Sequence, residues 1–269
     1  METDYQDEPP EVFQRLSAVD YARFHALEMA DSTEDVPFYR HFLGRRQTIL
    51  EAGCGDGRLG RRLAALGHKV VGIDNSLAML RQAARCPAPG FAVAAMDMRR
   101  LAFTRSFSAV VIASNTLNLL AGEEEVRQTL AACHAALQRD GRLLLHLFLP
   151  EQPAPSERHM QFKIMPLPEG GQLLKEIIRH YAPDAATMLL TERYKYRPSG
   201  DGMVLGNYRQ EMTLLAWPPE RWRRLFSETG WRIRFFSSDA PERFPFAVFA
   251  TNRALLAVLD KKSDGAFSA

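Results

Sequence analysis

The chain has 269 residues, enough for one large domain or for one domain with a sizeable insertion. Its formal net charge of +2 is too small to favour nucleic acid or a membrane surface as a partner, and no apolar run approaches the roughly 20 residues of a spanning helix. Three scattered cysteines and an acidic, proline-containing amino terminus favour reduced thiols and a cytoplasmic location.

Residues 1–45 are expected to form a helical segment close to the first core strand, where it can act as a lid. Residues 1–10 are expected to be a tail, and residues 12–29 carry apolar side chains at helical spacing. Residues 35–43 continue this pattern. Tyr21 could face a cationic ligand with its aromatic ring, or it could belong to the core.

A glycine-rich turn follows the first core strand. An apolar run ends at Glu51, whose carboxylate then stands at the carboxyl edge of the strand. Gly53, Gly55 and Gly57 come next at alternate positions, where a backbone without side chains turns tightly and lets a ligand approach. Residues 58–66 are predicted to form the helix that opens after the turn. Strand, turn and helix together predict a nucleotide-type crevice.

An acidic residue ends the second core strand, which is predicted at residues 69–74. Asp74 lies 21 positions after Gly53, close to the spacing of about 20 between a glycine turn and a ribose-binding acid. A carboxylate at this strand tip can accept hydrogen bonds from both hydroxyls of a ribose. We therefore expect Asp74 to bind the ribose of a nucleotide-type ligand.

The next segments alternate between strands and helices. Strands are predicted at residues 91–98, 108–114 and 142–148, and helices at residues 76–85 and 123–137. Short apolar strands that alternate with helices predict a parallel sheet covered on both faces. Residues 46–150 are therefore expected to form the ligand-binding core.

Polar residues near the ends of these strands are candidates for a site. Asp97 could accept a hydrogen bond from the exocyclic amine of an adenine, with Met98 offering its backbone amide and an apolar edge. Asn115 either orients a ligand or caps the following helix. His146 either acts as a general base, because the ordinary pKa of histidine suits that role, or is buried and bonded to backbone.

The alternating pattern stops after residue 150. Strands predicted at residues 173–180, 188–196 and 208–217 indicate an inserted antiparallel sheet, which we expect to form a cap over residues 151–217. Residues 218–253 are expected to return to the core, with a helix and two antiparallel edge strands at 231–237 and 246–252. Residues 254–269 are expected to be a tail.

With these residues in place, the chain resembles the class I S-adenosylmethionine-dependent methyltransferases. Residues 50–57 match the E/DxGxGxG signature of that family, residues 71–80 are similar to its vvGiDxSxxML segment, and residues 95–98 resemble its third motif. The resemblance covers roughly residues 21–253 and implies a doubly wound, mostly parallel seven-stranded sheet, the Rossmann-like methyltransferase fold of the α/β class. The inserted antiparallel β cap resembles the substrate cap of small-molecule members.

The resemblance also implies roles for single residues. Glu51 would help to hold the methionine amino group, the glycines would contact the amino-acid portion, Asp74 would bind the ribose, and Asp97 and Met98 would bind the adenine. The residues expected to contact S-adenosylmethionine are Glu51, Ala52, Gly53, Cys54, Gly55, Gly57, Asp74, Asn75, Met79, Asp97, Met98 and Asn115. Those expected near the reacting atoms are His146, Asn115 and Tyr21.

These features predict a cytoplasmic enzyme that moves a methyl group from S-adenosylmethionine to an oxygen or nitrogen of a small molecule. A non-catalytic cofactor-binding or partner-activating protein on the same fold is one alternative. An NAD(P)-dependent oxidoreductase is another, because residues 55–60 also satisfy the GxGxxG pattern. Against the latter, the Glu51 carboxylate would repel a pyrophosphate and attract an α-ammonium.

The sequence lacks the motifs expected for two further kinds of partner, a metal ion and a nucleic-acid substrate. The histidines show no metal-ligand spacing, so no metal site is expected. Residues 114–117 lack the Asn/Asp-Pro-Pro-aromatic tetrad of base-amine methyltransferases, which disfavours a nucleic-acid substrate. The sequence leaves open whether the protein forms a homodimer.

Overall fold

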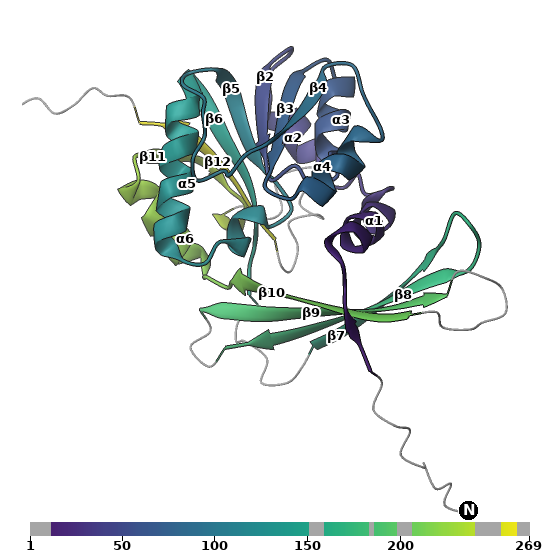
Figure 1. The fold of residues 1–269 in the computed structure, drawn as a ribbon. Coiled ribbons are helices and arrows are strands. Elements are labelled where there is room, and N and C mark those ends of the chain that lie inside the picture. Colours follow the sequence, from purple (N-terminus) through teal and green to yellow (C-terminus); the bar gives the residue numbers. More distant parts are fainter. Residues whose placement is uncertain (1–11, 151–158, 183–185, 198–205, 240–253, 263–269) are drawn as a thin grey trace, which may run out of the picture.

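The computed structural model describes residues 12–150, 159–182, 186–197, 206–239 and 254–262. These residues form two sheets, one of seven strands and one of five, with helix α1 (Ala18–Met29) lying between them (Figure 1). No helix of the described part of the chain is long and apolar enough to cross a membrane.

The seven-stranded sheet is parallel from β4 to β6 and antiparallel over its last two strands. This arrangement confirms the predicted doubly wound sheet with a closing antiparallel hairpin. In their spatial order the strands are β11 (Trp231–Phe236), β12 (Ala254–Lys261), β6 (Leu137–Phe148), β5 (Phe107–Ile112), β2 (Thr48–Ala52), β3 (Lys69–Asp74) and β4 (Phe91–Ala95).

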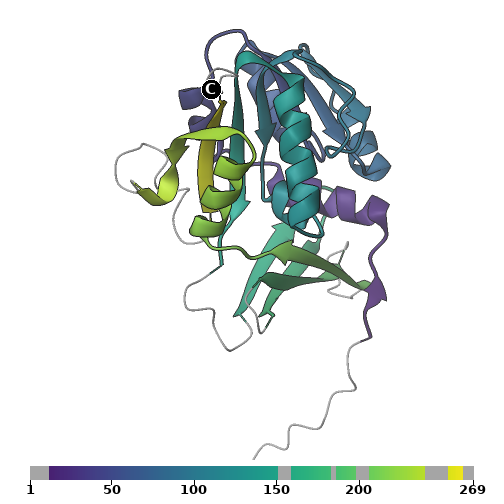
Figure 2. The ribbon, with the colours of Figure 1, turned by 90° about the vertical axis from the view of Figure 1, so that its left-hand side faces the viewer.

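Helices cover both faces of this sheet because its central strands are apolar on both sides. Leu50 faces the cluster that contains apolar side chains of α5 (Glu123–Ala136) and α6 (Pro219–Glu228), and Figure 2 shows both helices on one side of the sheet. Ile49 faces the opposite cluster. That cluster contains apolar side chains of α2 (Val36–Phe42) and α3 (Arg58–Ala65), while α4 (Leu77–Ala84) follows β3.

The five-stranded sheet is the predicted antiparallel insertion, which we call the cap sheet. Its strands in spatial order are β1 (Gln14–Arg15), β10 (Gly206–Leu215), β9 (Thr187–Arg197), β8 (Gln172–Tyr181) and β7 (His159–Pro166). All neighbours are antiparallel except β1 and β10, which run parallel. Phe24 of α1 packs on Tyr194 of this sheet with 5.3 Å between ring centroids, so α1 is held against the cap sheet.

Two boundaries expected from the sequence are wrong. Residues 254–269 are not simply a tail, because β12 lies between β6 and β11 with Leu255, Leu256 and Leu259 fully buried. The second strand of the hairpin is therefore β12, whereas the expected strand at residues 246–252 lies outside the described residues. The segment before residue 45 is also not entirely helical, since Gln14 and Arg15 pair with β10.

A buried asparagine joins the core to the cap sheet. Asn118 lies in the short 3₁₀ helix η1 (Thr116–Leu119) and has no exposed surface. Its Oδ1 accepts a hydrogen bond from the Phe148 N–H at 3.0 Å, and its Nδ2 donates to the carbonyls of Phe148 at 3.2 Å and Leu215 at 2.7 Å. Phe148 ends β6 and Leu215 ends β10, so Asn118 connects the strand that leaves the core to the strand that returns to it.

We predict that Asn118→Ala lowers the free energy of unfolding by about 2–5 kcal/mol, because three buried backbone groups lose their partner. Chemical denaturation measures this change. The matched control is Gln138→Ala, which removes an exposed amide with one 3.4 Å hydrogen bond and should change stability by less than about 0.5 kcal/mol. Equal stability of the two variants would contradict the structural role of Asn118.

Candidate functional site

The glycine turn after β2 is held between the carboxyl ends of β3 and β5. The N–H groups of Gly53 and Cys54 both donate to the carbonyl of Ile73, at 2.8 and 2.9 Å. Gly53 has φ +75°, and a Cβ on it would lie 2.2 Å from Cγ2 of Thr116, so only glycine fits this position. The turn therefore brings together three neighbouring strand ends.

Asp74 lies against this turn at the end of β3. Its Oδ2 accepts a hydrogen bond from the Gly55 N–H at 2.9 Å, and its Oδ1 accepts one from the Ser76 N–H at 2.8 Å. A carboxylate has about four acceptor positions, so each oxygen can still accept a hydroxyl. The half-buried Asp74 therefore combines a fixed orientation with spare acceptor capacity, which is what binding a ribose requires.

Glu51 lies beneath the start of the turn and against α3. Its side chain is only 2% exposed, and its Oε2 has no hydrogen-bond partner among the described residues. A Cβ on Gly60 of α3 would lie 2.7 Å from this oxygen. Burial raises the pKa of Glu51 to about 8, and the neighbouring Asp35 and Asp56 act in the same direction, whereas Arg58 opposes it. A buried carboxyl group with one unbonded oxygen suits a cationic partner.

A buried ion pair connects α2 to α3 on the same side of the sheet. Arg58 donates to Asp35 through both terminal nitrogens, at 2.8 and 2.5 Å, and both side chains are less than a tenth exposed. His146 feels both charges, and its burial lowers its pKa to about 4. The imidazole of His146 is therefore neutral at pH 7 and only weakly basic. The general-base role of His146 stays a prediction, but the argument from an ordinary histidine pKa does not apply to it.

Asn115 follows β5 in an unusual backbone conformation. Both Ser114 and Asn115 have positive φ, 51° and 62°, which costs non-glycine residues of order 1–3 kcal/mol each and is common at functional sites. The Asn115 N–H donates to the carbonyl of His146 at 3.1 Å. Its buried Oδ1 lacks a hydrogen-bond partner in the described part of the chain. The structure thus places an unsatisfied amide oxygen beside Thr116, which contacts the glycine turn.

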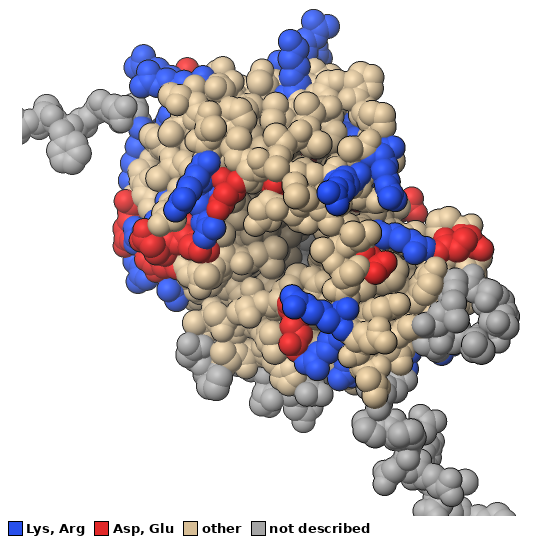
Figure 3. Space-filling view, in the orientation of Figure 1, with Lys and Arg blue, Asp and Glu red and all other residues tan. Residues whose placement is uncertain are grey.

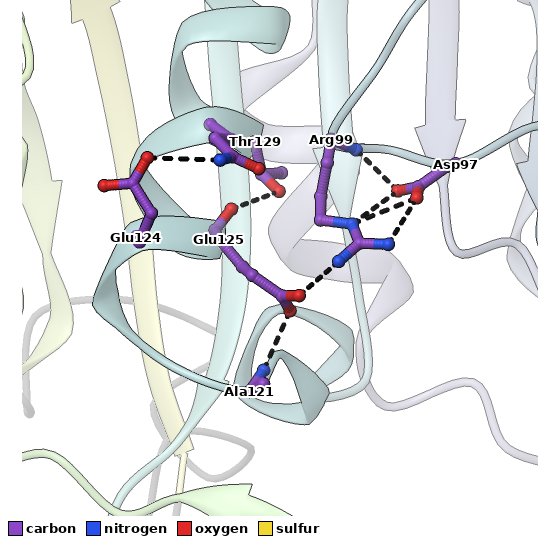
Figure 4. A network of polar contacts seen from close by, with 7 residues as sticks. Asp97, Arg99, Ala121, Glu124, Glu125 and Thr129 are labelled. Atoms are coloured by element: carbon purple, nitrogen blue, oxygen red, sulfur yellow. Dashed lines mark hydrogen bonds and ion pairs between the residues drawn. The ribbon is translucent and has the colours of Figure 1, made fainter.

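The carboxylate of Asp97 forms an ion pair with Arg99 (Figure 4). Its Oδ1 accepts from the backbone N–H of Arg99 at 2.9 Å, and both carboxylate oxygens accept from the Arg99 guanidinium. Arg99 also pairs with Glu125 of α5, whose Oε2 caps the Ala121 N–H at 2.9 Å. The guanidinium lowers the pKa of Asp97. An adenine amine would have to share this carboxylate with Arg99, so the adenine role of Asp97 stays a prediction.

Tyr21 projects from α1 between the core and the cap sheet. Its hydroxyl lies 3.8 Å from Sδ of Met212 on β10. Burial raises the pKa of Tyr21 well above its usual value, and the negative charges of Glu192, Glu28 and Asp74 act in the same direction. The Tyr21 hydroxyl therefore contacts the cap sheet and lies near enough to Asp74 to feel its charge.

The remaining predicted residues surround the turn at different depths. Met98 packs against the core beside Asp97. Ala52, Cys54 and Met79 are buried, Gly57 faces the ring of Phe91, and Asn75 is exposed. Burial raises the pKa of the Cys54 thiol, which makes it a poor nucleophile. Within the described ranges, no group of three or more His, Cys, Asp or Glu side chains could hold a metal ion.

Sequence reasoning missed His25. It lies one helical turn after Tyr21, with 6.0 Å between the two ring centroids. The i, i+4 spacing of the two aromatic side chains was the available signal, because such residues share a helix face. Without the cap sheet in place, nothing in the sequence distinguishes that face from a core-packing face.

The fold and the glycine turn can now be compared with those of known proteins. A mostly parallel seven-stranded sheet with a closing antiparallel hairpin is the Rossmann-like methyltransferase fold. Residues 49–141 match the family model described as "Methyltransferase domain". The match covers β2 through the first part of β6, which includes the glycine turn, Asp74 and Asn115.

Two curated bacterial proteins resemble part of this domain. A protein of Geobacillus sp. (strain WCH70) is 38% identical over 99 residues, which are 36% of this chain and 40% of the relative. A Bacillus subtilis (strain 168) protein named "Putative methyltransferase YqeM" is 34% identical over 105 residues, covering 38% of this chain and 42% of the relative. The matched stretch therefore spans about two fifths of each of these relatives.

Solved structures resemble the chain over nearly its whole length. CalS10 from Micromonospora echinaspora, an amino pentose methyltransferase, is 21% identical with a TM-score of 0.64, covering 91% of this chain and 92% of that one. The sugar N-methyltransferase KedS8 from Streptoalloteichus sp. is 16% identical with a TM-score of 0.70, covering 97% and 99%. At these identities the likeness concerns the fold, and it includes the cap sheet.

We predict that Glu51 makes the stability of the protein fall with rising pH. Its pKa is raised from 4.5 to about 8, so the folded state holds a proton that the unfolded state releases between these values. The slope is at most roughly 1.4 kcal/mol per pH unit. In Glu51→Gln this contribution is absent, so its stability relative to the parent should improve from pH 5 to pH 8. Chemical denaturation at three pH values measures this, and parallel pH profiles would rule it out.

Proposed function

We propose that this protein transfers a methyl group from S-adenosylmethionine to an oxygen or nitrogen nucleophile of a small molecule. The observation that carries the proposal is the glycine turn fixed between two strand ends, with Asp74 on the turn and the buried Glu51 carboxyl group, whose Oε2 is unbonded within the described residues, beneath it. A cationic amino-acid nucleoside has a charge for Glu51 and hydroxyls for Asp74. NAD(P) also has ribose hydroxyls for Asp74, but Glu51 would repel its pyrophosphate, which favours the methyltransferase over an NAD(P)-dependent oxidoreductase.

Three groups of residues would each hold one portion of this cofactor. The turn and Glu51 would hold the amino-acid portion, Asp74 the ribose, and the segment at Asp97 and Met98 the adenine. Asn115 would contribute its buried, unsatisfied Oδ1 to a donor on the cofactor or the nucleophile.

The chemistry needs little more than alignment. When bound, S-adenosylmethionine supplies a methyl group already activated by its sulfonium. The protein must then hold the nucleophile in line, exclude water and accept a proton if the nucleophile carries one. Helix α1 and the cap sheet are suited to exclude water, because α1 packs on the cap sheet and Tyr21 is largely buried between them and close enough to Asp74 to feel its charge.

A small-molecule acceptor is supported by the shape of the molecule. Figure 3 shows a hollow between the core and the cap sheet, and the charged side chains visible on this face lie around it rather than in it. A space bounded by a second sheet suits a compact acceptor better than a polymer. The likeness of the whole fold, including this sheet, to CalS10 and KedS8 supports a sugar-like acceptor.

We predict turnover with a small-molecule acceptor. The purified protein is incubated with S-adenosylmethionine and a panel of amines, sugars and phenols, and the release of S-adenosylhomocysteine is measured. Release that depends on an acceptor supports the enzyme. Cofactor binding without release for any acceptor would favour the non-catalytic alternative, whereas binding of NADH but not of S-adenosylmethionine would favour the oxidoreductase.

We predict that Asp74→Ala weakens S-adenosylhomocysteine binding by roughly 1.5–3 kcal/mol, about ten- to over a hundredfold, because charge-assisted hydrogen bonds to the ribose are lost. Calorimetry measures the affinity. Asp74→Asn is the companion variant, since its amide oxygen can still accept one of the two backbone N–H groups. The matched control is Asp140→Ala, which removes an exposed carboxylate. Unchanged affinity in Asp74→Ala would remove the ribose assignment.

A further inference from the structure

One face of α1 joins the core to the cap sheet. Tyr21, His25 and Glu28 lie four and three residues apart, so they occupy the same side of the helix. Tyr21 and His25 both feel charges from the cap sheet, and each also feels a carboxylate of the core, Asp74 for Tyr21 and Asp56 for His25. This face of α1 therefore lies between the glycine turn and the cap sheet.

The charges of the cap sheet beside this face are already paired. Nζ of Lys175 contacts Glu28 Oε2 at 2.6 Å and also pairs with Glu192. The Tyr194 hydroxyl donates to Glu192 Oε2 at 2.9 Å. Lys175 and Glu192 are only 4% and 5% exposed. The charged and polar groups of this cluster are therefore paired with one another, so none of them needs a further partner.

His25 differs from this cluster because one of its ring nitrogens lacks a hydrogen-bond partner within the described residues. Its Nδ1 is buried and has no hydrogen-bond partner among the residues that the structure describes. The charged groups around it are Asp56 from the glycine turn, Glu28 from its own helix, and Lys175 and Glu192 from the cap sheet. Buried polar atoms normally have partners, and an exception requires an explanation. A ligand group that lies between the turn and the cap sheet would supply the missing one.

Burial lowers the pKa of His25 as it does that of His146, but more carboxylates surround His25, so a proton gained during a reaction is better stabilised on it. Burial lowers the pKa of His25, so the imidazole is neutral at rest and keeps a lone pair. Asp56, Glu28 and Glu192 stabilise a positive charge on the ring, and Lys175 opposes it. The neighbouring Tyr21 ring, tilted by 48° to the imidazole, restricts its orientation.

We propose that Nδ1 of His25 accepts the proton of the substrate nucleophile, a role that rests on the proposed methyl transfer. The bond from the nucleophile to the methyl carbon forms while the carbon–sulfur bond breaks, and the electron pair of the broken bond stays on sulfur. The proton of the nucleophile passes to Nδ1 and later leaves to solvent. The substrate is then a small molecule with an O–H or N–H at the reacting atom.

The test compares two cofactor analogues, so it needs no known substrate. S-adenosylhomocysteine has no group at the position of the transferred methyl, whereas sinefungin carries an ammonium there. In the parent protein this ammonium can donate to Nδ1, directly or through one water in the place of the nucleophile. We expect His25→Ala to weaken sinefungin binding at least fivefold while S-adenosylhomocysteine binding stays within twofold.

Two further variants show whether a change in sinefungin binding comes from the loss of the acceptor at position 25 or from a general disturbance of the protein. His25→Asn keeps an acceptor oxygen near Nδ1, so sinefungin affinity should recover, but it cannot take a proton, so turnover of any acceptor found in the panel should stay low. His41→Ala, at an exposed position on α2, should leave both affinities and turnover unchanged. Calorimetry measures the affinities, and circular dichroism checks that each variant is folded.

The outcomes distinguish a failure of the proposed methyl transfer from a failure of the role proposed for His25. If the parent protein binds neither analogue, the proposed function fails and His25 has no such role. If the parent binds S-adenosylhomocysteine but His25→Ala changes both affinities equally, or neither, the proposal for His25 is overturned while the proposed function stands. Full turnover by His25→Asn would also overturn the proposal.

Discussion

The crevice depends on the carboxylate of Asp74, which accepts the N–H groups of Gly55 and Ser76 at the same time. A turn with three glycines has many accessible backbone conformations, and fixing it costs entropy. Hydrogen bonds to a charged acceptor, about 1.5–3 kcal/mol each, offset part of that cost. Because the same oxygens are the proposed acceptors for ribose hydroxyls, the shape of the turn and the binding of the ligand are physically coupled.

Local signals were sufficient to predict the parallel strands of the core and the glycine turn. The run that ends at Asp74 is buried and apolar, and Ser76 caps α4 as its residue type favours, accepting from the Met79 N–H at 3.3 Å. The strand predicted at residues 188–196 is likewise present, as β9. In each case the information lies within a few neighbouring residues, so no knowledge of the tertiary structure was needed.

Features that depend on distant contacts could not be predicted. The short apolar run at β12 becomes a central strand only because β6 and β11 lie on either side of it. Asp97 was expected to be available to a ligand, but Arg99 and Glu125 form a chain of charges that only the packing of α5 creates. His25 gained its significance when the cap sheet supplied Lys175 and Glu192 opposite α1. Pairings between residues far apart in the sequence, from 26 residues for Arg99 and Glu125 to more than a hundred for β12 and β6, leave little local trace.

The position of β12 has a consequence for how the protein is made. This strand pairs with β6, more than a hundred residues earlier in the chain, and separates it from β11. Until residue 261 has emerged from the ribosome, the apolar edge of β6 lacks its native neighbour. Unpaired strand edges of this kind promote association between nascent chains. Growing polypeptides of this protein would therefore depend on molecular chaperones until translation has passed that point.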